Sequence, residues 1–248
     1  ISSMPLIIAY VVWRKATPTL FDVRWPLHLF RVVVGIAMLT SFAFALKTLP
    51  LTEAYALFFI SPLLIAALSI PFLGEKVSRA SWIAIVFGML GVLVVLKPSG
   101  EGLISWAGLA ILGSAACYAF SAITVRLLGR TDSSESMVFW LMFGMSIGAA
   151  LLARQVWKPI LAEDYGLIML LAGAGFVGQL AITEAFKRAP AAAVTPYEYS
   201  ALVWGLGLDL LIWQVTPGIR VLIGSAIIVA SGIYLARHEA SGIEAEHP

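Results

Sequence analysis

The chain has 248 residues, of which 60% are hydrophobic and 12% are charged, with a formal net charge of +2. Soluble domains usually have about a quarter of their residues charged, so this composition excludes an ordinary water-exposed surface. The basic residues do not cluster with aromatic ones, so we expect no nucleic-acid partner. The composition therefore predicts a polytopic membrane protein.

The first apolar segment, Ile1–Trp13, is too short to cross a bilayer and is followed by Arg14 and Lys15. A hydrocarbon core about 30 Å thick needs roughly 20 helical residues. We therefore expect Ile1–Trp13 to be the second half of a helix that starts before Ile1. The polar connection Ala16–Pro26 follows it.

Eight later segments are long and apolar enough to cross a membrane as helices, which predicts an all-α protein. They are Leu27–Leu46, Leu51–Leu73, Ser81–Leu96, Leu103–Val125, Ser136–Leu152, Gly166–Phe186, Ala191–Trp213 and Ile219–Ala236. The second and third form a hairpin, because only the charged turn 74–79 separates them. We divide the chain into a first half (1–98), a second half (103–237) and a polar tail (238–248) that is predicted to be disordered.

The Lys and Arg residues predict the orientation, because positive charge is retained on the cytoplasmic side of a membrane. Eleven of them lie at one set of alternate span ends and five at the other. The larger set includes Lys76, Arg79 and Arg237. We therefore expect a multi-pass protein of the bacterial inner (plasma) membrane with its C-terminus in the cytoplasm.

A short motif occurs twice in the sequence. Residues 45–50 read ALKTLP, and residues 185–190 read AFKRAP. Each copy precedes a long span, a short turn and a final span that carries a glycine. By the predicted orientation, the first copy faces outward and the second faces the cytoplasm. Inverted repeats of this kind are typical of transporters that bind their substrate at the midplane between the halves.

Residues 45–98 resemble the first signature of the drug/metabolite transporter superfamily, EamA-type branch. The shared features are ALxxLP at 45–50, SP at 61–62, LGE at 73–75, glycines at 88 and 91, and VLKP at 95–98. Residues 179–234 resemble the corresponding second half, with PYEYSALVW at 196–204 and IGSAIIVASG at 223–232.

The resemblance implies a fold of ten helices in two inverted five-helix halves, so the chain is expected to lack one helix and part of another at its N-terminus. It also implies transport of small metabolites such as amino acids, S-adenosylmethionine, vitamins or drugs. The second half has Gln214-Val215 where the family usually repeats Gly-Glu. This departure argues against a symmetric role for Glu75.

Glu198 is the first candidate for substrate binding, because ionisable side chains inside a span are costly and usually functional. It lies seven residues into Ala191–Trp213, about 10 Å deep at helical rise, beside Tyr197 and Tyr199 and two turns before Trp204. Loss of hydration at this depth favours the protonated carboxyl group, which could couple transport to a proton. Alternatively, an ionised Glu198 could bind a cationic substrate group, or it could serve only in packing.

Asp209, Glu53, Tyr55 and Tyr118 complete the predicted set of substrate-binding residues. Asp209 lies eleven residues after Glu198 and shares its helical face, but a place at the outer boundary explains it equally well. Glu53 lies in the first turn of its span, where a carboxylate also stabilises the helix dipole.

Several other residues in the spans have structural explanations. Glu184 and Arg188 are four residues apart and are expected to form an interfacial ion pair. Arg31, near the cytoplasmic end of its span, is expected to be an interfacial anchor rather than a ligand. Pro62 and Pro196 lie inside spans at corresponding places, where a kink could form a gate or be merely tolerated.

The motif GxGxxG at 173–178 lies within an uninterrupted span, so it does not indicate dinucleotide binding. We expect these glycines, and those of Gly144–Gly148, to allow close helix contact. His28, His238 and His247 lack metal-ligand spacing, and no nucleophile–base set stands out. We therefore predict no metal, no cofactor and no enzyme activity.

Together these observations predict a transporter that moves a small polar metabolite, amino-acid-like, S-adenosylmethionine-like or vitamin-like, across the inner membrane by alternating access. The substrate would bind in a central cavity between the halves, lined by Leu51–Leu73 and Ala191–Trp213. An intramembrane enzyme and a non-transporting membrane subunit are the alternatives. The expected partners are a small-molecule substrate and the lipid bilayer. Coupling to a proton or to an exchanged substrate is left open, and so is a homodimer.

Overall fold

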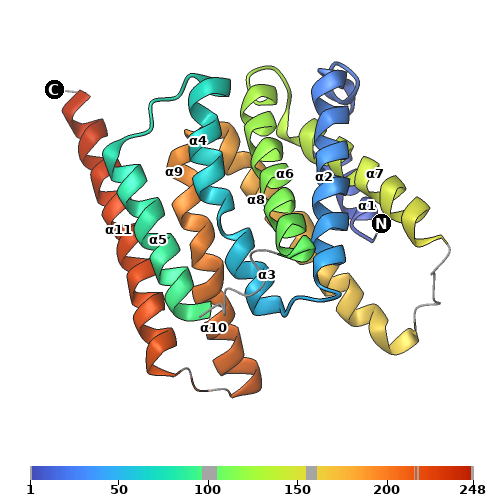
Figure 1. Ribbon diagram of the computed structural model, residues 1–248. Coiled ribbons are helices and arrows are strands. Elements are labelled where there is room, and N and C mark those ends of the chain that lie inside the picture. Colours follow the sequence, from blue (N-terminus) through green and yellow to red (C-terminus); the bar gives the residue numbers. More distant parts are fainter. Residues whose placement is uncertain (1, 97–104, 155–160, 215, 217, 247–248) are drawn as a thin grey trace. The chain divides into compact units, whose positions relative to one another are not determined.

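The computed structural model describes residues 2–96, 105–154, 161–214, 216 and 218–246, and every regular element in these ranges is a helix. In chain order (Figure 1) the elements are α1 (Met4–Trp13), the 3-10 helix η1 (Thr17–Leu20), α2 (Trp25–Ala45), α3 (Leu51–Phe58), α4 (Ser61–Leu73), α5 (Arg79–Leu96), α6 (Trp106–Leu128), α7 (Ser134–Ala153), η2 (Ala162–Asp164), α8 (Tyr165–Arg188), α9 (Ala191–Val194), η3 (Thr195–Tyr199), α10 (Ser200–Trp213) and α11 (Ile219–Glu246).

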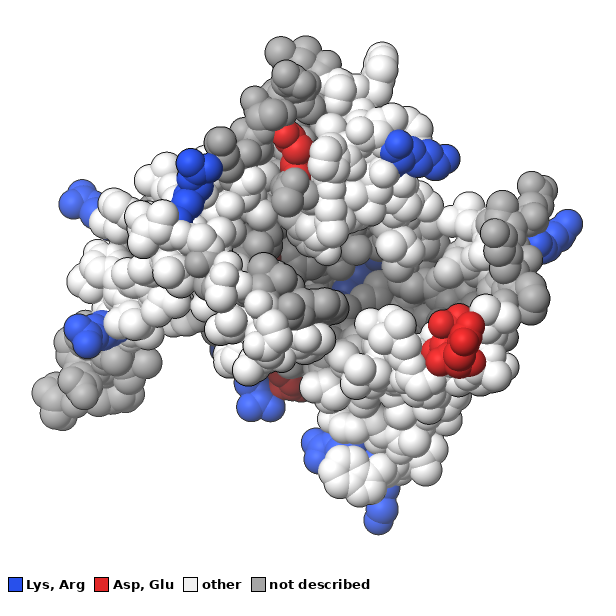
Figure 2. Space-filling view, turned by 90° about the horizontal axis from the view of Figure 1, so that it is seen from below, with Lys and Arg blue, Asp and Glu red and all other residues white. Residues whose placement is uncertain are grey.

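The predicted class, an all-helical polytopic protein, is confirmed. Within the described residues, seven apolar helical segments are long enough to cross a membrane, with α3 and α4 counted together. Charged side chains are sparse on the face that Figure 2 presents. The seventh predicted span, Ala191–Trp213, is not the continuous helix that we expected, because it is divided into α9, η3 and α10.

The described part of the tail is drawn as helix (Figure 1), and its predicted disorder stays a prediction. Helix α11 continues past the apolar residues and ends at Glu246. The sequence after Arg237 contains alanines and glutamates, which are good helix formers, so the helix continues without an apolar face to support it.

The chain forms two compact units. The first unit contains residues 1–37 and 120–189, and the second contains residues 38–119 and 190–248. Each unit therefore draws on both halves of the sequence, and α2 and α6 each contribute one end to each unit. The division into halves at 1–98 and 103–237 stays a prediction.

In the first unit, α2 and α7 approach closely because α7 carries glycines. A Cβ atom at Gly144 would lie 2.4 Å from Cγ2 of Val32, and one at Gly148 would lie 2.4 Å from Cδ1 of Ile36. Such distances are far below van der Waals contact, so a larger residue at either position would have to displace the facing side chain. The predicted close contact at Gly144–Gly148 is confirmed.

The glycines of α8 behave differently. A Cβ atom at Gly173, Gly175 or Gly178 would meet no atom within 4 Å in the structure as described. The expectation that these glycines allow close helix contact is therefore wrong for the described residues. Both α7 and α8 carry closely spaced glycines. Those of α7 face another helix, α2, at close range, whereas those of α8 do not face one among the described residues.

In the second unit, α5 and α11 lie side by side (Figure 1) and pack through a pair of glycines. A Cβ atom at Gly91 would lie 2.9 Å from the carbonyl oxygen of Gly224. One at Gly224 would lie 2.7 Å from the carbonyl oxygen of Gly91. The two backbones are thus in direct contact, as small residues permit in membrane helices.

Two spans of the second unit are interrupted near a proline. Helix α3 ends at Phe58, and α4 begins at Ser61 with Pro62 as its second residue. Pro196 is the second residue of η3, which separates α9 from α10. Proline has no N–H group and clashes with the preceding turn, so an α-helix does not continue through it undisturbed. Both proline positions that the sequence indicated therefore coincide with breaks, and a gating role for them stays a prediction.

The turn after α4 is held against the start of α9. Gly74 has a φ of 70°, which favours glycine, and its N–H group donates to the carbonyl oxygen of Ile70. The next residue, Glu75, accepts a hydrogen bond at Oε2 from the N–H group of Ala191, at 2.9 Å. The carboxylate thus satisfies one free N–H group at the start of α9.

Candidate functional site

Glu198 and Tyr118 form a polar contact inside the second unit. The Tyr118 hydroxyl group, on α6, donates a hydrogen bond to Oε1 of Glu198, on η3, and the two oxygens are 2.9 Å apart. An ionised carboxylate can accept several hydrogen bonds, and inside a span each accepted bond offsets part of its lost hydration. Two of the predicted substrate-binding residues, 80 positions apart in the sequence, are therefore brought together.

Aromatic rings extend from this hydrogen bond in a continuous series, which we name the aromatic cluster. Its members, in spatial order, are Tyr118, Phe58, Phe42, Tyr55, Phe59 and Tyr199. Consecutive ring centroids are 5.6 Å to 6.2 Å apart, within the range of interacting aromatic pairs. The first member donates a hydrogen bond to Glu198, and the last member is the residue that follows Glu198 in the chain.

Two buried hydroxyl groups near the helix breaks make no hydrogen bond with the described residues. They are Oγ of Ser61, at the start of α4, and Oη of Tyr199, in η3. Leaving a buried donor unpaired costs about 1–3 kcal/mol, so such groups are rare away from functional places. The Tyr199 ring is fixed by close packing against Gly88 of α5.

The remaining predicted substrate-binding residues lie elsewhere in the described part of the structure, or their side chains are not described. Trp204 is 75% exposed and Tyr197 is 43% exposed, so neither side chain is enclosed with Glu198. The Tyr197 ring instead lies beside Gly232 of α11. Glu53 is buried in the first turn of α3. The side chain of Asp209 lies outside the described residues, so its shared face with Glu198 stays a prediction.

Sequence reasoning missed three members of the aromatic cluster, Phe42, Phe58 and Phe59. Aromatic residues in an apolar span face lipid as often as they face the interior, so their presence alone carries no signal. The spacing of Tyr55, Phe58 and Phe59 places all three on one face of a helix and could have indicated the cluster.

A second polar group of residues lies in the first unit. Arg31 is 2% exposed, and its Nη1 atom donates to the carbonyl oxygen of Met137 at 3.0 Å. Its Nε atom donates to Oγ of Ser121 at 3.4 Å. The prediction that Arg31 is an interfacial anchor is therefore wrong, because an anchor extends towards the headgroups. The sequence could not distinguish the two because the partners lie on distant segments.

Near Arg31, Nε2 of His28 lies 2.8 Å from Oδ2 of Asp132, and both side chains are buried. The backbone N–H group of Arg24 also donates to Oδ2, and the Thr131 hydroxyl group donates to Oδ1. Burial raises the pKa of Asp132, but the hydrogen bonds from Thr131, His28 and Arg24 outweigh burial and hold the pKa below its ordinary value. Asp132 therefore stays ionised and joins the α6–α7 connection to the start of α2.

The predicted pair on α8 is confirmed. Nε of Arg188 lies 2.7 Å from Oε2 of Glu184, and the Arg188 side chain is 79% exposed. Exposed pairs of this kind contribute little to stability. Within the described residues, no three His, Cys, Asp or Glu side chains are grouped closely enough to hold a metal ion.

Comparison with protein families gives one match that covers nearly the whole chain. The model described as the EamA-like transporter family matches residues 1–97 and 105–237.

Two named transporters are similar to this chain over most of their length. The pseudopaline exporter CntI of Pseudomonas aeruginosa is 27% identical over 239 residues, which cover 95% of this chain and 84% of the relative. The S-adenosylmethionine uptake transporter of Rickettsia conorii is 26% identical over 246 residues, which cover 99% of this chain and 83% of the relative. A solved crystal structure superimposes with a TM-score of 0.79 at 20% identity, covering 94% of this chain and 83% of that one. At this identity the structural likeness shows the fold alone.

Proposed function

Since the chain belongs to the EamA-like transporter family, we propose that it moves a small polar metabolite across the inner membrane by alternating access, with the substrate bound beside Glu198. Membership makes the chain a multi-pass membrane transporter of small metabolites and not an enzyme. The proposals that the substrate is polar and that it binds beside Glu198 rest on the contacts of Tyr118, Glu198 and the aromatic cluster.

The observation that carries the proposal is the Tyr118–Glu198 hydrogen bond at one end of the aromatic cluster, whose other end, Tyr199, follows Glu198 in the chain. A carboxylate supplies negative charge, and aromatic faces attract cations and stack on flat rings. Together they suit a substrate that has an amine or sulfonium group, or an aromatic ring. Amino-acid-like, S-adenosylmethionine-like and vitamin-like metabolites all contain such groups.

The broken spans support movement at this place. Glu198 and Tyr199 lie in η3, and Phe58 and Phe59 lie at the break between α3 and α4. In many transporters, discontinuous helices form the substrate site, because their free backbone groups bind ligands and their ends can move separately. We infer that the two breaks move during alternating access, as the prolines at 62 and 196 suggest. A central cavity between inverted halves remains part of this proposal.

Glu198 has two alternative roles. It stays ionised and pairs with the cation of the substrate, or it takes up a proton in one state of the cycle and releases it in another. The S-adenosylmethionine uptake transporter favours the first role, because that metabolite carries a sulfonium cation. One relative is named as an exporter and another as an uptake transporter, so the direction of transport does not follow from the family.

The proposal also includes an orientation in the membrane, further candidate contacts and an open question of assembly. The bias of Lys and Arg supports an inner-membrane orientation with the C-terminus in the cytoplasm. Tyr197, Trp204, Asp209 and Glu53 are kept as candidate contacts in other states of the cycle. A homodimer and coupling to an exchanged substrate are compatible with the family and rest on no described contact.

The test uses purified protein in liposomes and a panel of labelled amino acids, S-adenosylmethionine and vitamins. Once a transported metabolite is found, Glu198→Gln is compared with the wild type in binding and in exchange of labelled for unlabelled substrate. If Glu198 pairs with the substrate, binding fails in the variant. If Glu198 carries a proton, exchange survives and loses its pH dependence. A variant with wild-type binding, net uptake and pH profile contradicts both roles.

A further inference from the structure

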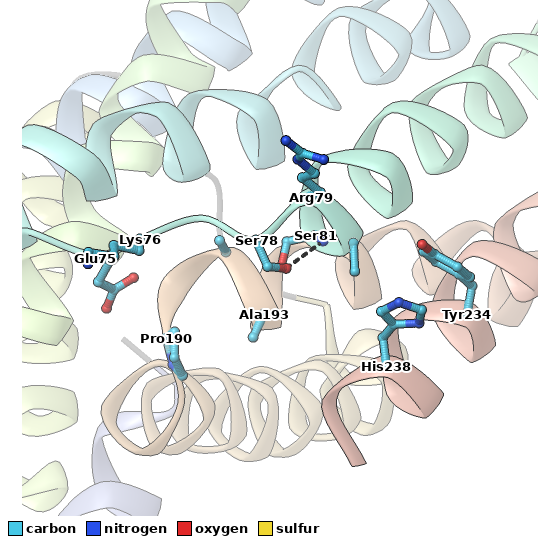
Figure 3. Close-up of a pocket in the computed structure, with 11 residues that line it drawn as sticks. Glu75, Lys76, Ser78, Arg79, Ser81, Pro190, Ala193, Tyr234 and His238 are labelled. Carbon is cyan, nitrogen blue, oxygen red and sulfur yellow. Dashed lines mark hydrogen bonds between the residues drawn. The ribbon is translucent and has the colours of Figure 1, made fainter. Parts of the chain in front are cut away.

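A polar pocket lies at one end of the α5–α11 pair, away from the residues of the candidate site. Its volume is about 450 Å³. Residues of the α4–α5 connection, the start of α5, the start of α9 and the end of α11 line it, as Figure 3 shows. They include Lys76, Ser78, Arg79, Tyr234 and His238. None of these residues contributes to the aromatic cluster.

The charges of this pocket suit an anion. Lys76 and Arg79 are exposed, and neither forms a hydrogen bond or an ion pair with another described side chain. Ser78 adds a hydroxyl group, which lies 2.8 Å from Oγ of Ser81 and accepts the N–H group of Ser81. Glu75 also lines the pocket, but its Oε2 atom already accepts the N–H group of Ala191. The lining therefore has two basic side chains, Lys76 and Arg79, against one carboxylate.

An apolar hollow of about 330 Å³ adjoins the polar pocket along the same pair of helices. Ile83 and Phe87 of α5 and Ile227 and Ala230 of α11 line it. Tyr234 lines both hollows, so they adjoin each other at this side chain. Ile83 and Phe87 are about half exposed, so this hollow is open to the hydrocarbon core.

The residues form stripes that run from polar to apolar. Arg79, Ile83 and Phe87 are four residues apart on α5 and therefore lie on one face. Their positions span about 12 Å along the helix. Ile227, Tyr234 and His238 form the facing stripe on α11. A ligand that fills both hollows thus has an anionic head at the membrane surface and an apolar chain that points into the bilayer.

We propose that the groove between α5 and α11 binds an anionic phospholipid. Lys76, Arg79 and the hydroxyl group of Ser78 hold the phosphodiester, and Ile83 and Phe87 contact the acyl chain. Basic pockets at the ends of membrane helices are typical sites for anionic headgroups. The assignment requires only that this end of the groove lies at a membrane surface, on either side. It is independent of the role of Glu198.

The test is native mass spectrometry of the full chain in a non-ionic detergent. Three probes are added: palmitoyl-oleoyl phosphatidylglycerol, phosphatidylcholine with the same chains, and inorganic phosphate. We expect phosphatidylglycerol to bind in preference to phosphatidylcholine. The double variant Lys76→Gln/Arg79→Gln should bind phosphatidylglycerol about 30-fold more weakly, since each cation near an anionic surface strengthens binding about fivefold. Lys15→Gln/Arg130→Gln is the matched control, which removes two other exposed cations and should bind as the wild type does.

The variant Ala230→Phe fills the apolar hollow without changing any charge. It should weaken binding of phosphatidylglycerol and leave any binding of inorganic phosphate unchanged. Wild-type binding of phosphatidylglycerol by Lys76→Gln/Arg79→Gln would overturn the proposal. A site that binds inorganic phosphate as tightly as the lipid, with no effect of Ala230→Phe, would be a free-phosphate site and would overturn it too.

Discussion

Replacing Gly88 with alanine tests how the Tyr199 ring is held beside Glu198. A Cβ atom at Gly88 would lie 2.3 Å from Cδ2 and 2.7 Å from Cε2 of that ring. Tyr199 is fully buried and packs in a cluster with Phe59 and Ile228, so the ring has no empty space into which it can move. We therefore expect the added methyl group to displace the ring and, with it, the neighbouring carboxylate.

The size of the effect follows from two opposing terms. Overpacking a filled interior costs about 1–3 kcal/mol. Alanine stabilises a helix interior by about 1 kcal/mol relative to glycine. Gly113→Ala on α6 is the matched control, because a Cβ atom there meets nothing within 4 Å and only the stabilising term applies. With a clash of about 2 kcal/mol, the melting temperatures of the two variants should differ by roughly 5 °C for a chain of this size.

The assay is thermal unfolding of both variants in detergent, followed by uptake into liposomes. Gly88→Ala should melt below Gly113→Ala and should transport more slowly, because Tyr199 and Glu198 are adjacent in η3. If Gly88→Ala is as stable as Gly113→Ala and transports like the wild type, the packing of Tyr199 does not position Glu198.

Three further predictions concern other parts of the chain. Gly144→Leu should destabilise the protein by about 2 kcal/mol or more in thermal unfolding, whereas Gly173→Leu should leave it nearly unchanged, because only Gly144 is packed against another helix. The pKa of Asp132 is lower in the folded state than its ordinary value of 3.8, so ionised Asp132 stabilises the fold fully above pH 3.8 and progressively less as the pH falls below that value. Asp132→Asn should remove this part of the pH dependence of stability. An acid unfolding curve that is the same in the variant and the wild type would refute this role of Asp132. A reporter fused after Arg237 should be cytoplasmic and one within Val156–Asp164 external, and the reverse pattern would overturn the predicted orientation.

The spans could be predicted from the sequence because a membrane imposes length and composition on every helix that crosses it. The predicted ends of Leu103–Val125 and Ser136–Leu152 differ from those of α6 and α7 by a few residues only. Such shifts are expected, because polar residues at the interface continue a helix without changing its apolar run. Pro62 and Pro196 indicated where two spans break, because a proline inside a helix removes a backbone hydrogen bond and clashes with the preceding turn. Pro71 shows that the rule is not strict, since α4 contains it and continues to Leu73.

Contacts between distant segments could not be predicted in the same way. Glu198 was identified from its own cost in lipid, whereas its hydrogen bond with Tyr118 depends on how η3 packs against α6. Arg31 lies near the end of a span, as an interfacial anchor does, and its buried role is revealed by partners on distant segments, among them the carbonyl oxygen of Met137, 106 positions away. The sequence identifies ionisable residues that are costly to bury in a membrane. Which groups form hydrogen bonds with them depends on how distant segments pack.

The most direct measurement of the central claim is net uptake of the transported metabolite by Glu198→Gln in liposomes, with Glu184→Gln as the matched control. Glu184 also lies in an apolar span, but its partner Arg188 is 79% exposed, so its loss should cost little. If Glu198 binds the substrate or carries the coupling proton, uptake by Glu198→Gln falls to background while Glu184→Gln transports like the wild type. Wild-type uptake by Glu198→Gln, in a folded and inserted protein, would contradict the account.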